Sequence, residues 1–162
     1  MFEIKPITEK DYQIIVNWNN GKDKNYLNLW AGPNVYHYPI TIEQIKKHDK
    51  NVNSKIFMIL YQNNPIGSVE LDKIDYENLS SHVSRYIICD EHMNKGYGTM
   101  ALKKLIEMSF SEMKLNILTL SVFCFNVGAI RCYEKAGFLV KKFNKVEDQD
   151  WNSYIMEIKN SE

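Results

Sequence analysis

Two short segments of the chain combine residues that can hold an anion with a residue that can donate a proton. Residues 90–99, DEHMNKGYGT, place Gly96 and Gly98 between a hydrophobic stretch and an amphipathic one. Main-chain N–H groups at the start of a helix bind phosphate, and glycines let a ligand approach them closely. Residues 126–138, NVGAIRCYEKAGF, place Tyr133 in a short helical segment. Together the segments predict a site for a phosphorylated cofactor with a proton donor beside its reactive end.

The better-known phosphate loops do not fit the first segment. A dinucleotide fingerprint needs a third glycine, which the residues around Leu102 do not supply. A nucleoside-triphosphate loop needs Gly-Lys-Ser/Thr, whereas Lys95 precedes Gly96 here. A nucleotide-dependent kinase is therefore disfavoured, although a glycine pair alone also occurs in strand-to-helix turns that bind nothing.

The elements that must position these residues follow from hydrophobic periodicity. Strand patterns are expected at 2–7, 55–62, 66–71, 83–89, 117–123, 138–146 and 151–158. A turn is expected at 63–65, and the polar segment 72–81 is expected to be a connection. Helical patterns are expected behind Thr8, at 23–30, behind Thr41, at 99–113 and at 127–136. Strand–helix–strand crossovers in the second half imply a central mixed sheet covered by helices. No repeat is visible, so residues 1–162 are expected to form a single domain.

Composition limits the classes of partner. The chain is 44% hydrophobic and 25% charged, which is ordinary for a globular domain and argues against disorder. The 20 basic and 20 acidic residues cancel, so no overall field attracts nucleic acid or an anionic membrane. We therefore expect neither nucleic acid nor a membrane as a partner.

The cysteines and the amino-terminal residues indicate a compartment. Cys89, Cys124 and Cys132 form none of the close pairs that metal and redox motifs need, and free thiols fit a reducing environment. The first residues, MFEIK, open in a strand pattern without an apolar signal segment, and no run reaches membrane-spanning length. We expect a cytoplasmic protein without a metal.

The two segments resemble the GNAT superfamily of acetyl-CoA-dependent N-acetyltransferases. Residues 93–98, MNKGYG, are similar to the family's Arg/Gln-x-x-Gly-x-Gly/Ala loop, with Met93 in the first position. Residues 126–138 look like its second cofactor motif, and the order of elements matches. The resemblance implies an α/β (α+β) fold. Its sheet would be mixed, mostly antiparallel and of about seven strands, with helices on both faces and two splayed parallel strands. It also implies acetyl-CoA as the acyl donor.

The resemblance also implies cofactor contacts. Pantetheine would pair with the main chain of Ile87, Ile88 and Cys89, and a main-chain N–H near Ile88 would stabilise the oxyanion. The amides after Met93 would hold the diphosphate, namely those of Asn94, Lys95, Gly96, Tyr97, Gly98 and Thr99. Asn126 and Ala129 would contact the pantetheine arm, Arg131 a CoA phosphate, and Tyr133 the sulfur.

Acetyl transfer from a thioester to an amine needs a proton donor and often a base. Tyr133 is the candidate acid for the leaving thiolate, since a phenol of pKa about 10 can donate to it. Glu70, His82 and Ser84 are candidates for the base, acting directly or through water, although such residues are more often solvated parts of a strand. An amine of pKa near 10.4 needs such a base more than an α-amine of pKa about 8.

The acceptor remains open at this stage. Trp30, Tyr36 and Tyr38, with Glu70, would line an acceptor pocket, or the aromatic side chains would pack the loop onto the core. The segment somewhat resembles acetyltransferases of the ribosomal-protein N-terminal type. We expect direct attack in a ternary complex by a small-molecule amine or a peptide N-terminus, in a monomer or homodimer. The alternative is a non-catalytic CoA-binding sensor or interaction module.

Overall fold

The computed structural model describes residues 1–161, which form seven strands, five α-helices and three short 3-10 turns. The strands are β1 (Phe2–Pro6), β2 (Lys55–Tyr61), β3 (Asn64–Asp75), β4 (Ser80–Ile88), β5 (Ile117–Phe123), β6 (Leu139–Asn144) and β7 (Ser153–Lys159). The helices are α1 (Tyr12–Trp18), α2 (Lys24–Ala31), α3 (Ile42–Asp49), α4 (Tyr97–Ser111) and α5 (Val127–Ala136). The 3-10 turns are η1 (Glu9–Asp11), η2 (Asp90–His92) and η3 (Gln149–Trp151).

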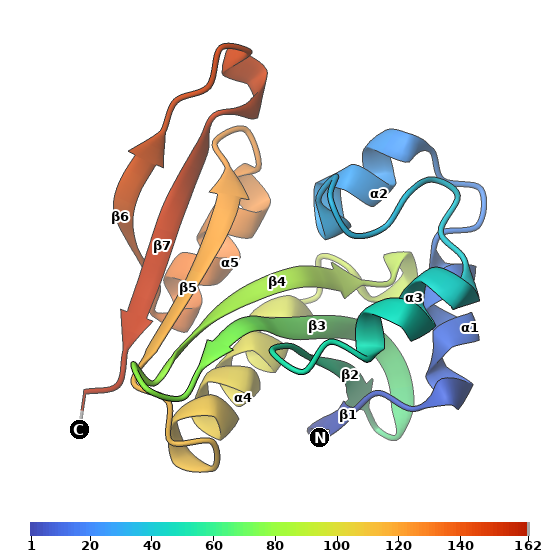
Figure 1. Ribbon diagram of the computed structural model, residues 1–162, viewed down its shortest axis with the longest axis horizontal. Helices are drawn as coiled ribbons and strands as arrows, with labels where there is room; N and C mark the ends of the chain where they lie inside the picture. Colours follow the sequence, from blue (N-terminus) through green and yellow to red (C-terminus); the bar gives the residue numbers. More distant parts are fainter. Residues whose placement is uncertain (162) are drawn as a thin grey trace.

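All seven strands belong to one sheet in the order β1-β2-β3-β4-β5-β7-β6 (Figure 1). Every neighbouring pair is antiparallel except β4 and β5, which are parallel. The expected mixed, mostly antiparallel sheet is therefore confirmed. No helix of the described residues is long and apolar enough to cross a membrane.

The parallel strands part from each other halfway along their length. Their register runs from Ser80 opposite Ile117 to Val83 opposite Leu120 and then stops. β4 nevertheless continues to Ile88 and β5 to Phe123. Figure 1 shows the two strands diverging toward α2. The expected splay of two parallel strands is confirmed, and it leaves one edge of β4 free.

A bulge in β4 lies where the splay begins. Ser68 of β3 is opposite Ile87, but Glu70 is opposite Ser84, so β4 holds one extra residue in this interval. Arg85 lies there with φ of 46°, a left-handed backbone conformation that is rare for residues other than glycine. Gly67 of β3 faces this part of β4, and a Cβ there would lie 2.3 Å from the Ile87 carbonyl oxygen. Glycine at 67 therefore permits the close approach of the two strands.

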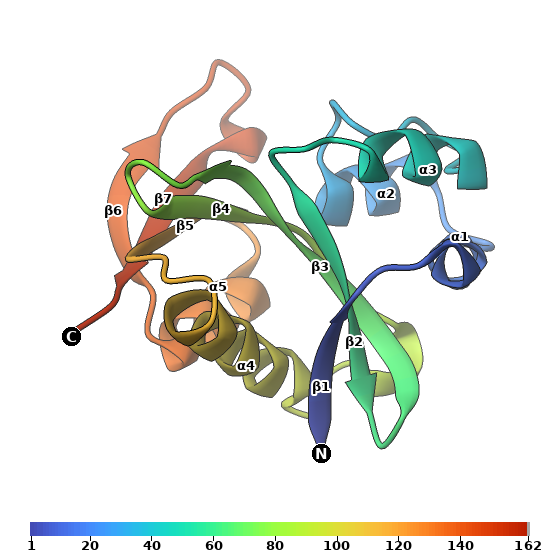
Figure 2. The same ribbon diagram turned by 60° about the horizontal axis from the view of Figure 1, so that its bottom comes forward.

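Helices cover both faces of the sheet, as Figure 2 shows. α4 buries Leu102 and Leu105 in a main core with β-strand residues such as Leu118 and Met156. A second core lies on the other face, where α1, α2 and α3 meet around Met58. Neighbouring residues of β2 point into different cores because side chains of a strand alternate between faces.

Several strand boundaries differ from those expected: β6 ends at Asn144 rather than 146 and β7 begins at Ser153 rather than 151, and the larger differences lie in β3 and β4. The polar segment 72–81 was expected to be a connection, but β3 runs on to Asp75 and β4 begins at Ser80. The β2–β3 turn uses Gln62 and Asn63, with φ of 51° and 67°, rather than residues 63–65. Two consecutive residues of positive φ match the twist of a tight hairpin, and Pro65 then pairs with Leu60.

Candidate active site

The gap between the parted strands opens into a cleft of about 680 Å³. Its walls come from the free edge of β4, the 92–99 loop, α5 and the residues of α2 that lie across the opening. The cleft is lined by Tyr26, Leu29, Trp30, Tyr86, Ile87, Ile88, His92, Met93, Asn94, Gly96, Gly98, Thr99, Asn126, Gly128, Ala129, Arg131, Cys132, Tyr133 and Lys135.

The amino terminus of α4 offers main-chain donors at one end of this cleft. Gly96 is the N-cap residue and has φ of 80°, which glycine adopts without strain. The first intrahelical bond runs from the Met100 N–H to the Gly96 carbonyl, so the preceding amides have no such partner. These N–H groups and the positive end of the helix dipole suit a diphosphate.

The loop residues expected to hold the diphosphate divide into two groups. Side chains or main chain of Met93, Asn94, Gly96, Gly98 and Thr99 line the cleft. Lys95 is exposed outside its lining, and the Tyr97 ring packs against the rings of Phe2, Tyr61 and His92. Neither Lys95 nor Tyr97 is a lining residue of the cleft.

The free edge of β4 presents alternate peptide groups to the cleft. The Cys89 N–H donates to the Ile66 carbonyl oxygen at 2.8 Å, so Cys89 is paired with the β3 side. Consecutive residues of a strand direct their peptide groups to opposite sides, and Ile88 therefore faces the opening. The expectation for Cys89 needs correction, because its N–H is occupied. Its thiol is buried, with Sγ 3.2 Å from His92 Nδ1.

Asn126 and Tyr133 come to the cleft from α5. Asn126 caps the helix, and its Oδ1 accepts a hydrogen bond from the Ala129 N–H at 3.3 Å. The Tyr133 ring packs edge-on against Phe138 with 6.2 Å between ring centroids. Burial raises the pKa of the Tyr133 phenol, so the hydroxyl stays protonated and remains a donor across the working pH range.

Cys132 joins α5 to α4 at the base of the cleft. The Thr99 hydroxyl donates to Cys132 Sγ at 3.4 Å. Burial raises the pKa of this thiol, which keeps it neutral and a poor nucleophile. A Cβ on Gly98 would lie 3.6 Å from the same sulfur. The small residue at 98 therefore leaves the helix start open to a ligand.

Several lining residues were not predicted from the sequence to bind the cofactor, although Cys132 was expected to pack near its sulfur. Gly128, Cys132 and Lys135 lie one helical turn apart on the side of α5 that carries Tyr133, so helical spacing could have found them. Tyr86 donates its hydroxyl to the Gly98 carbonyl and so ties β4 to α4. Tyr26 and Leu29 give no local signal, because only the fold brings α2 to the cleft.

The three aromatic residues expected at the acceptor site are found in three different places. Trp30 lines the cleft, and its Nε1 donates to Asn19 Oδ1 at 2.9 Å. Tyr36 is only 3% exposed and packs between Trp30 and His48 in the second core, so it does not reach the cleft. Tyr38 lies at a separate cavity of about 160 Å³. These two tyrosines do not line the cleft: Tyr36 packs in the second core, as the alternative expected, and Tyr38 lies at the separate cavity.

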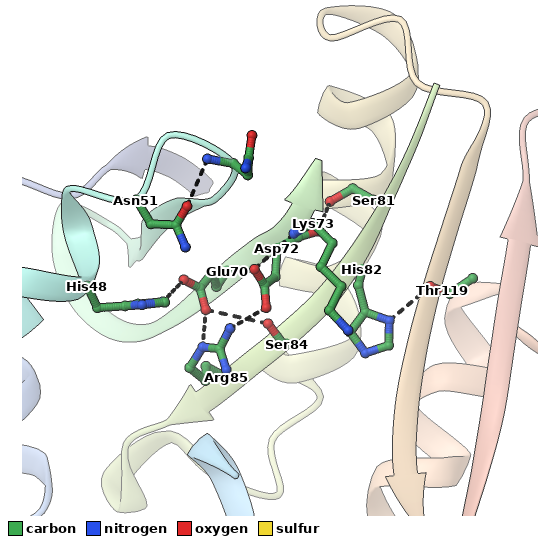
Figure 3. A network of polar contacts seen from close by, with 11 residues as sticks. His48, Asn51, Glu70, Asp72, Lys73, Ser81, His82, Ser84, Arg85 and Thr119 are labelled. Carbon is green, nitrogen blue, oxygen red and sulfur yellow. Dashed lines mark hydrogen bonds and ion pairs between the residues drawn. The ribbon is translucent and has the colours of Figure 1, made fainter. Parts of the chain in front are cut away.

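Glu70 and Ser84 also lie outside the cleft lining. They belong to the polar face of the sheet, where Glu70 contacts His48 Nε2 and Arg85 Nε (Figure 3). Ser84 Oγ donates to Glu70 Oε2 at 3.5 Å, and Arg85 Nη2 lies 2.6 Å from Asp72 Oδ2. The residues His48, Glu70, Asp72 and Arg85 are called the charged network below.

The charged network corrects the expectation that Glu70 binds the acceptor or acts as a base. The Glu70 side chain is 1% exposed, and both of its oxygens have partners: Oε1 contacts His48, and Oε2 contacts Arg85 and Ser84. Glu70 is thus held inside the charged network and lies outside the lining of the cleft. Within residues 1–161, no group of three or more His, Cys, Asp or Glu side chains could hold a metal ion.

A mixed sheet whose central parallel strands part beside a helix amino terminus defines a class of acyltransferases that bind an extended, phosphorylated thioester. The family assignment agrees with this class. Residues 23–138 match the acetyltransferase (GNAT) family, and the chain therefore belongs to that family.

Named relatives are similar to this chain over nearly its whole length. The spermidine N(1)-acetyltransferase of Vibrio cholerae is 27% identical over 157 residues, which covers 96% of this chain and 88% of that protein. Acetyltransferase PseH of Campylobacter jejuni is 22% identical over 165 residues, which covers 100% of this chain and 96% of that protein. The crystal structure of the Vibrio cholerae spermidine N-acetyltransferase with CoA and spermine has a TM-score of 0.82 at 24% identity, covering 99% and 96% of the two chains.

The protein is therefore an N-acetyltransferase, and its acyl donor is acetyl-CoA. This outcome confirms the expected enzyme class and donor.

Proposed function

We propose that acetyl-CoA binds along the free edge of β4 and that a primary amine attacks it there in a ternary complex. A single observation carries the proposal. One continuous cleft brings together the α4 amides, the Ile88 main chain, Asn126 and Tyr133. When bound, acetyl-CoA supplies an activated acetyl carbonyl and a thiolate leaving group.

The chain supplies binding groups along the length of this donor. The amides at 94–99 hold the diphosphate, and Asn126 donates its side-chain NH₂ to the pantetheine arm. Arg131 and Lys135 lie one turn apart on α5, both are exposed, and both line the cleft. Their charges attract the remaining phosphate of CoA, since cations near an anionic ligand raise its local concentration.

Two groups act on charge that develops during transfer. A main-chain N–H on the free edge of β4, near Ile88, stabilises the oxyanion. The protonated Tyr133 hydroxyl donates to the leaving thiolate, because burial favours its neutral form. Cys132 is beside Tyr133 in the same wall and packs without taking part in the chemistry.

The acceptor we propose is a small molecule with a primary amine, with a polyamine as the first compound to test. Vibrio cholerae enzymes similar to this chain are named for spermidine. Across the opening, Tyr26 and Trp30 supply aromatic faces that attract alkylammonium groups. A peptide N-terminus, as used by the ribosomal-protein type, is the second acceptor class.

The assembly and location we propose follow from the single-chain site. The α4 amino terminus, the β4 edge and α5 of one chain already form a continuous cleft, and we propose a monomer or homodimer. A Vibrio cholerae relative has been solved as a dodecamer, so light scattering is the direct measurement for this chain. Its three cysteines are free, which suits the reducing cytoplasm.

The test combines binding with turnover. Calorimetry on ligand-free protein should show binding of acetyl-CoA and of CoA. Release of free thiol should then be followed with spermidine, spermine, an amino sugar and a short peptide with a free N-terminus. Rapid release with a polyamine supports the proposal, and faster release with the peptide moves the acceptor to the second class. Tight CoA binding without release from any amine would instead favour a sensor, and absence of CoA binding would remove the cleft as the donor site.

A further inference from the structure

His92 differs from the other histidines of the chain in its place relative to the cleft. Of the four histidines, all of which lie within the described residues 1–161, only His92 lines the cleft. His48 belongs to the charged network, His82 lies on the paired part of β4, and His37 is in an exposed loop. His92 ends the η2 turn that follows β4, and its main-chain N–H donates to the Cys89 carbonyl oxygen at 2.9 Å. A ligand in the cleft can therefore contact this one imidazole.

The His92 ring lies between the two parts of the proposed acetyl-CoA site. On one side, Nδ1 is 3.2 Å from Sγ of Cys89, the residue that follows the free edge of β4. On the other side, the ring centroid is 5.8 Å from that of Tyr97, the first residue of α4. The β4 edge is proposed to bind pantetheine and the α4 amides the diphosphate. His92 is therefore placed where these two parts of CoA join.

The contact with Cys89 decides which nitrogen of the ring carries a hydrogen. Burial raises the pKa of the Cys89 thiol, which therefore keeps its hydrogen. A thiol sulfur is only a weak acceptor, so the favourable arrangement has the S–H donating to His92 Nδ1. The neutral ring then carries its hydrogen on Nε2, and a protonated ring carries one there as well. Nε2–H is a hydrogen-bond donor in both forms.

Nε2 of His92 is accessible to a ligand. The one hydrogen-bond contact of the ring is that of Nδ1, and no buried side-chain nitrogen within residues 1–161 lacks a partner. Two other side-chain donors near the start of α4 are already used within the protein. The Thr99 hydroxyl donates to Cys132 Sγ, and the Tyr86 hydroxyl donates to the Gly98 carbonyl oxygen. His92 thus offers a side-chain donor that these residues do not.

The neighbouring residue Met93 leaves this role open. It lines the cleft and is 47% exposed, and it occupies the loop position where the family pattern has Arg or Gln. A thioether has no hydrogen to donate. Among the described residues that line the cleft there is no Asp or Glu, so no carboxylate of the lining competes for the hydrogen on Nε2.

We propose that His92 Nε2–H donates a hydrogen bond to the phosphate that joins pantetheine to the rest of CoA, and so replaces a donor that Met93 cannot supply. This inference rests on the proposed function, because it takes CoA to lie along β4 with its diphosphate at the start of α4. A hydrogen bond to a charged acceptor is roughly twice as strong as one between neutral groups. His92 is thereby a binding residue for the acetyl donor.

The first test is His92→Phe, which keeps an aromatic ring beside Tyr97 and removes the hydrogen-bond donor. Calorimetry should show that CoA affinity falls by about 5- to 50-fold. His92→Gln retains an amide NH₂ near the position of Nε2 and should lose less than about threefold. His37→Phe, the same change at an exposed loop histidine, should bind CoA as the wild type does. If His92→Phe also binds CoA as tightly as the wild type, the inference is overturned.

Fragments of CoA separate a phosphate contact from packing of the ring. Phosphopantetheine carries the phosphate in question, and pantetheine lacks it. In NMR titrations, His92→Phe should weaken binding of phosphopantetheine by about 5- to 50-fold and that of pantetheine by less than about twofold. Equal losses for the two fragments would show that the ring acts by packing, which would overturn the inference.

NMR of ¹⁵N-labelled histidine in the wild type gives a measure that does not need a folded variant. In mildly alkaline buffer, His92 should carry its hydrogen on Nε2, and this signal should shift on addition of CoA or phosphopantetheine but not of pantetheine. A lone pair on Nε2, or a signal that CoA does not move, would overturn the inference alone. Absence of CoA binding by the wild type would instead overturn the proposed function and this inference with it.

Discussion

The free edge of β4 and the polar face of the sheet offer a ligand different kinds of polar group. On the edge, main-chain N–H and C=O groups near Ile88 have no strand partner because β5 has moved away. On the polar face, the carboxylates of Glu70 and Asp72 are paired with Arg85 and His48. The edge of β4, which has few charges, is thus the region that can bind an anionic acyl donor. The charged groups of the polar face are instead paired with one another.

The difference teaches that residue type alone is a weak guide to function. Glu70 and Ser84 have the chemistry of a base, but their partners hold them in structural roles. Gly96 and Gly98 have no side-chain chemistry, and their contribution is access to amides. A group is available for catalysis when the fold leaves it unpaired next to the substrate.

The largest effect is expected from breaking the charged network. Glu70→Gln removes one partner of a buried ion pair, and it should lower the free energy of unfolding by about 3–5 kcal/mol. Urea unfolding of the variant and of Lys103→Gln, an exposed control on α4, measures this directly. If Glu70→Gln loses turnover without losing stability, Glu70 belongs to the catalytic machinery and the contrast between the two regions is gone.

The next effect concerns the proton donor on the cleft side. Tyr133→Phe should lower kcat by about 10²-fold or more while CoA affinity stays close to that of the wild type. Because the pKa of Tyr133 is raised, the wild type should show no loss of activity from its ionisation as the pH rises toward 10. Single-turnover kinetics and calorimetry separate the two quantities, and equal turnover in the two proteins would exclude Tyr133 as the acid.

A smaller effect is expected at Gly98. Gly98→Ala should bind CoA almost normally, since the added Cβ would meet Cys132 Sγ at 3.6 Å, an ordinary contact. Gly98→Val adds two further carbons at a crowded helix start. We expect these to weaken the free energy of CoA binding by about 1–3 kcal/mol, which is roughly 5- to 150-fold in affinity. Calorimetry of the pair tests the access to the amides, and a Gly98→Val protein that binds CoA as tightly as Gly98→Ala would contradict it.

The smallest effect concerns the exposed cations of α5. Arg131→Ala and Lys135→Ala should each weaken CoA binding by about 0.2–1 kcal/mol, because exposed charge pairs are screened by water. The loss should shrink as salt is raised toward 1 M, where the screening length is about 3 Å. Lys103→Ala is the matched control outside the cleft. A loss that is independent of salt would indicate a contact other than charge attraction.

Local sequence patterns were sufficient to predict most helices and strands and the loop at residues 93–98. The apolar run 117–123 and the helical pattern at 127–136 appear as β5 and α5 with the same bounds. The turn before β3 was misplaced by one residue, because both residues of positive φ follow Tyr61 directly. The segment 72–81 was predicted to be a connection because it is polar. The sequence does not show that β3 and β4 pair with each other along it.

The residues proposed for the donor side could be identified from the sequence by itself. Gly96, Gly98, Asn126 and Tyr133 lie in two contiguous segments, and each acts through the local geometry of a helix terminus or a helix face. Tertiary structure alone decided the acceptor side, since Trp30, Tyr36 and Tyr38 are neighbours in sequence but lie in a cleft, a core and a separate cavity. The physical reason is that hydrogen bonds within a turn depend on nearby residues, whereas the availability of a buried polar group depends on the partners that distant strands bring to it.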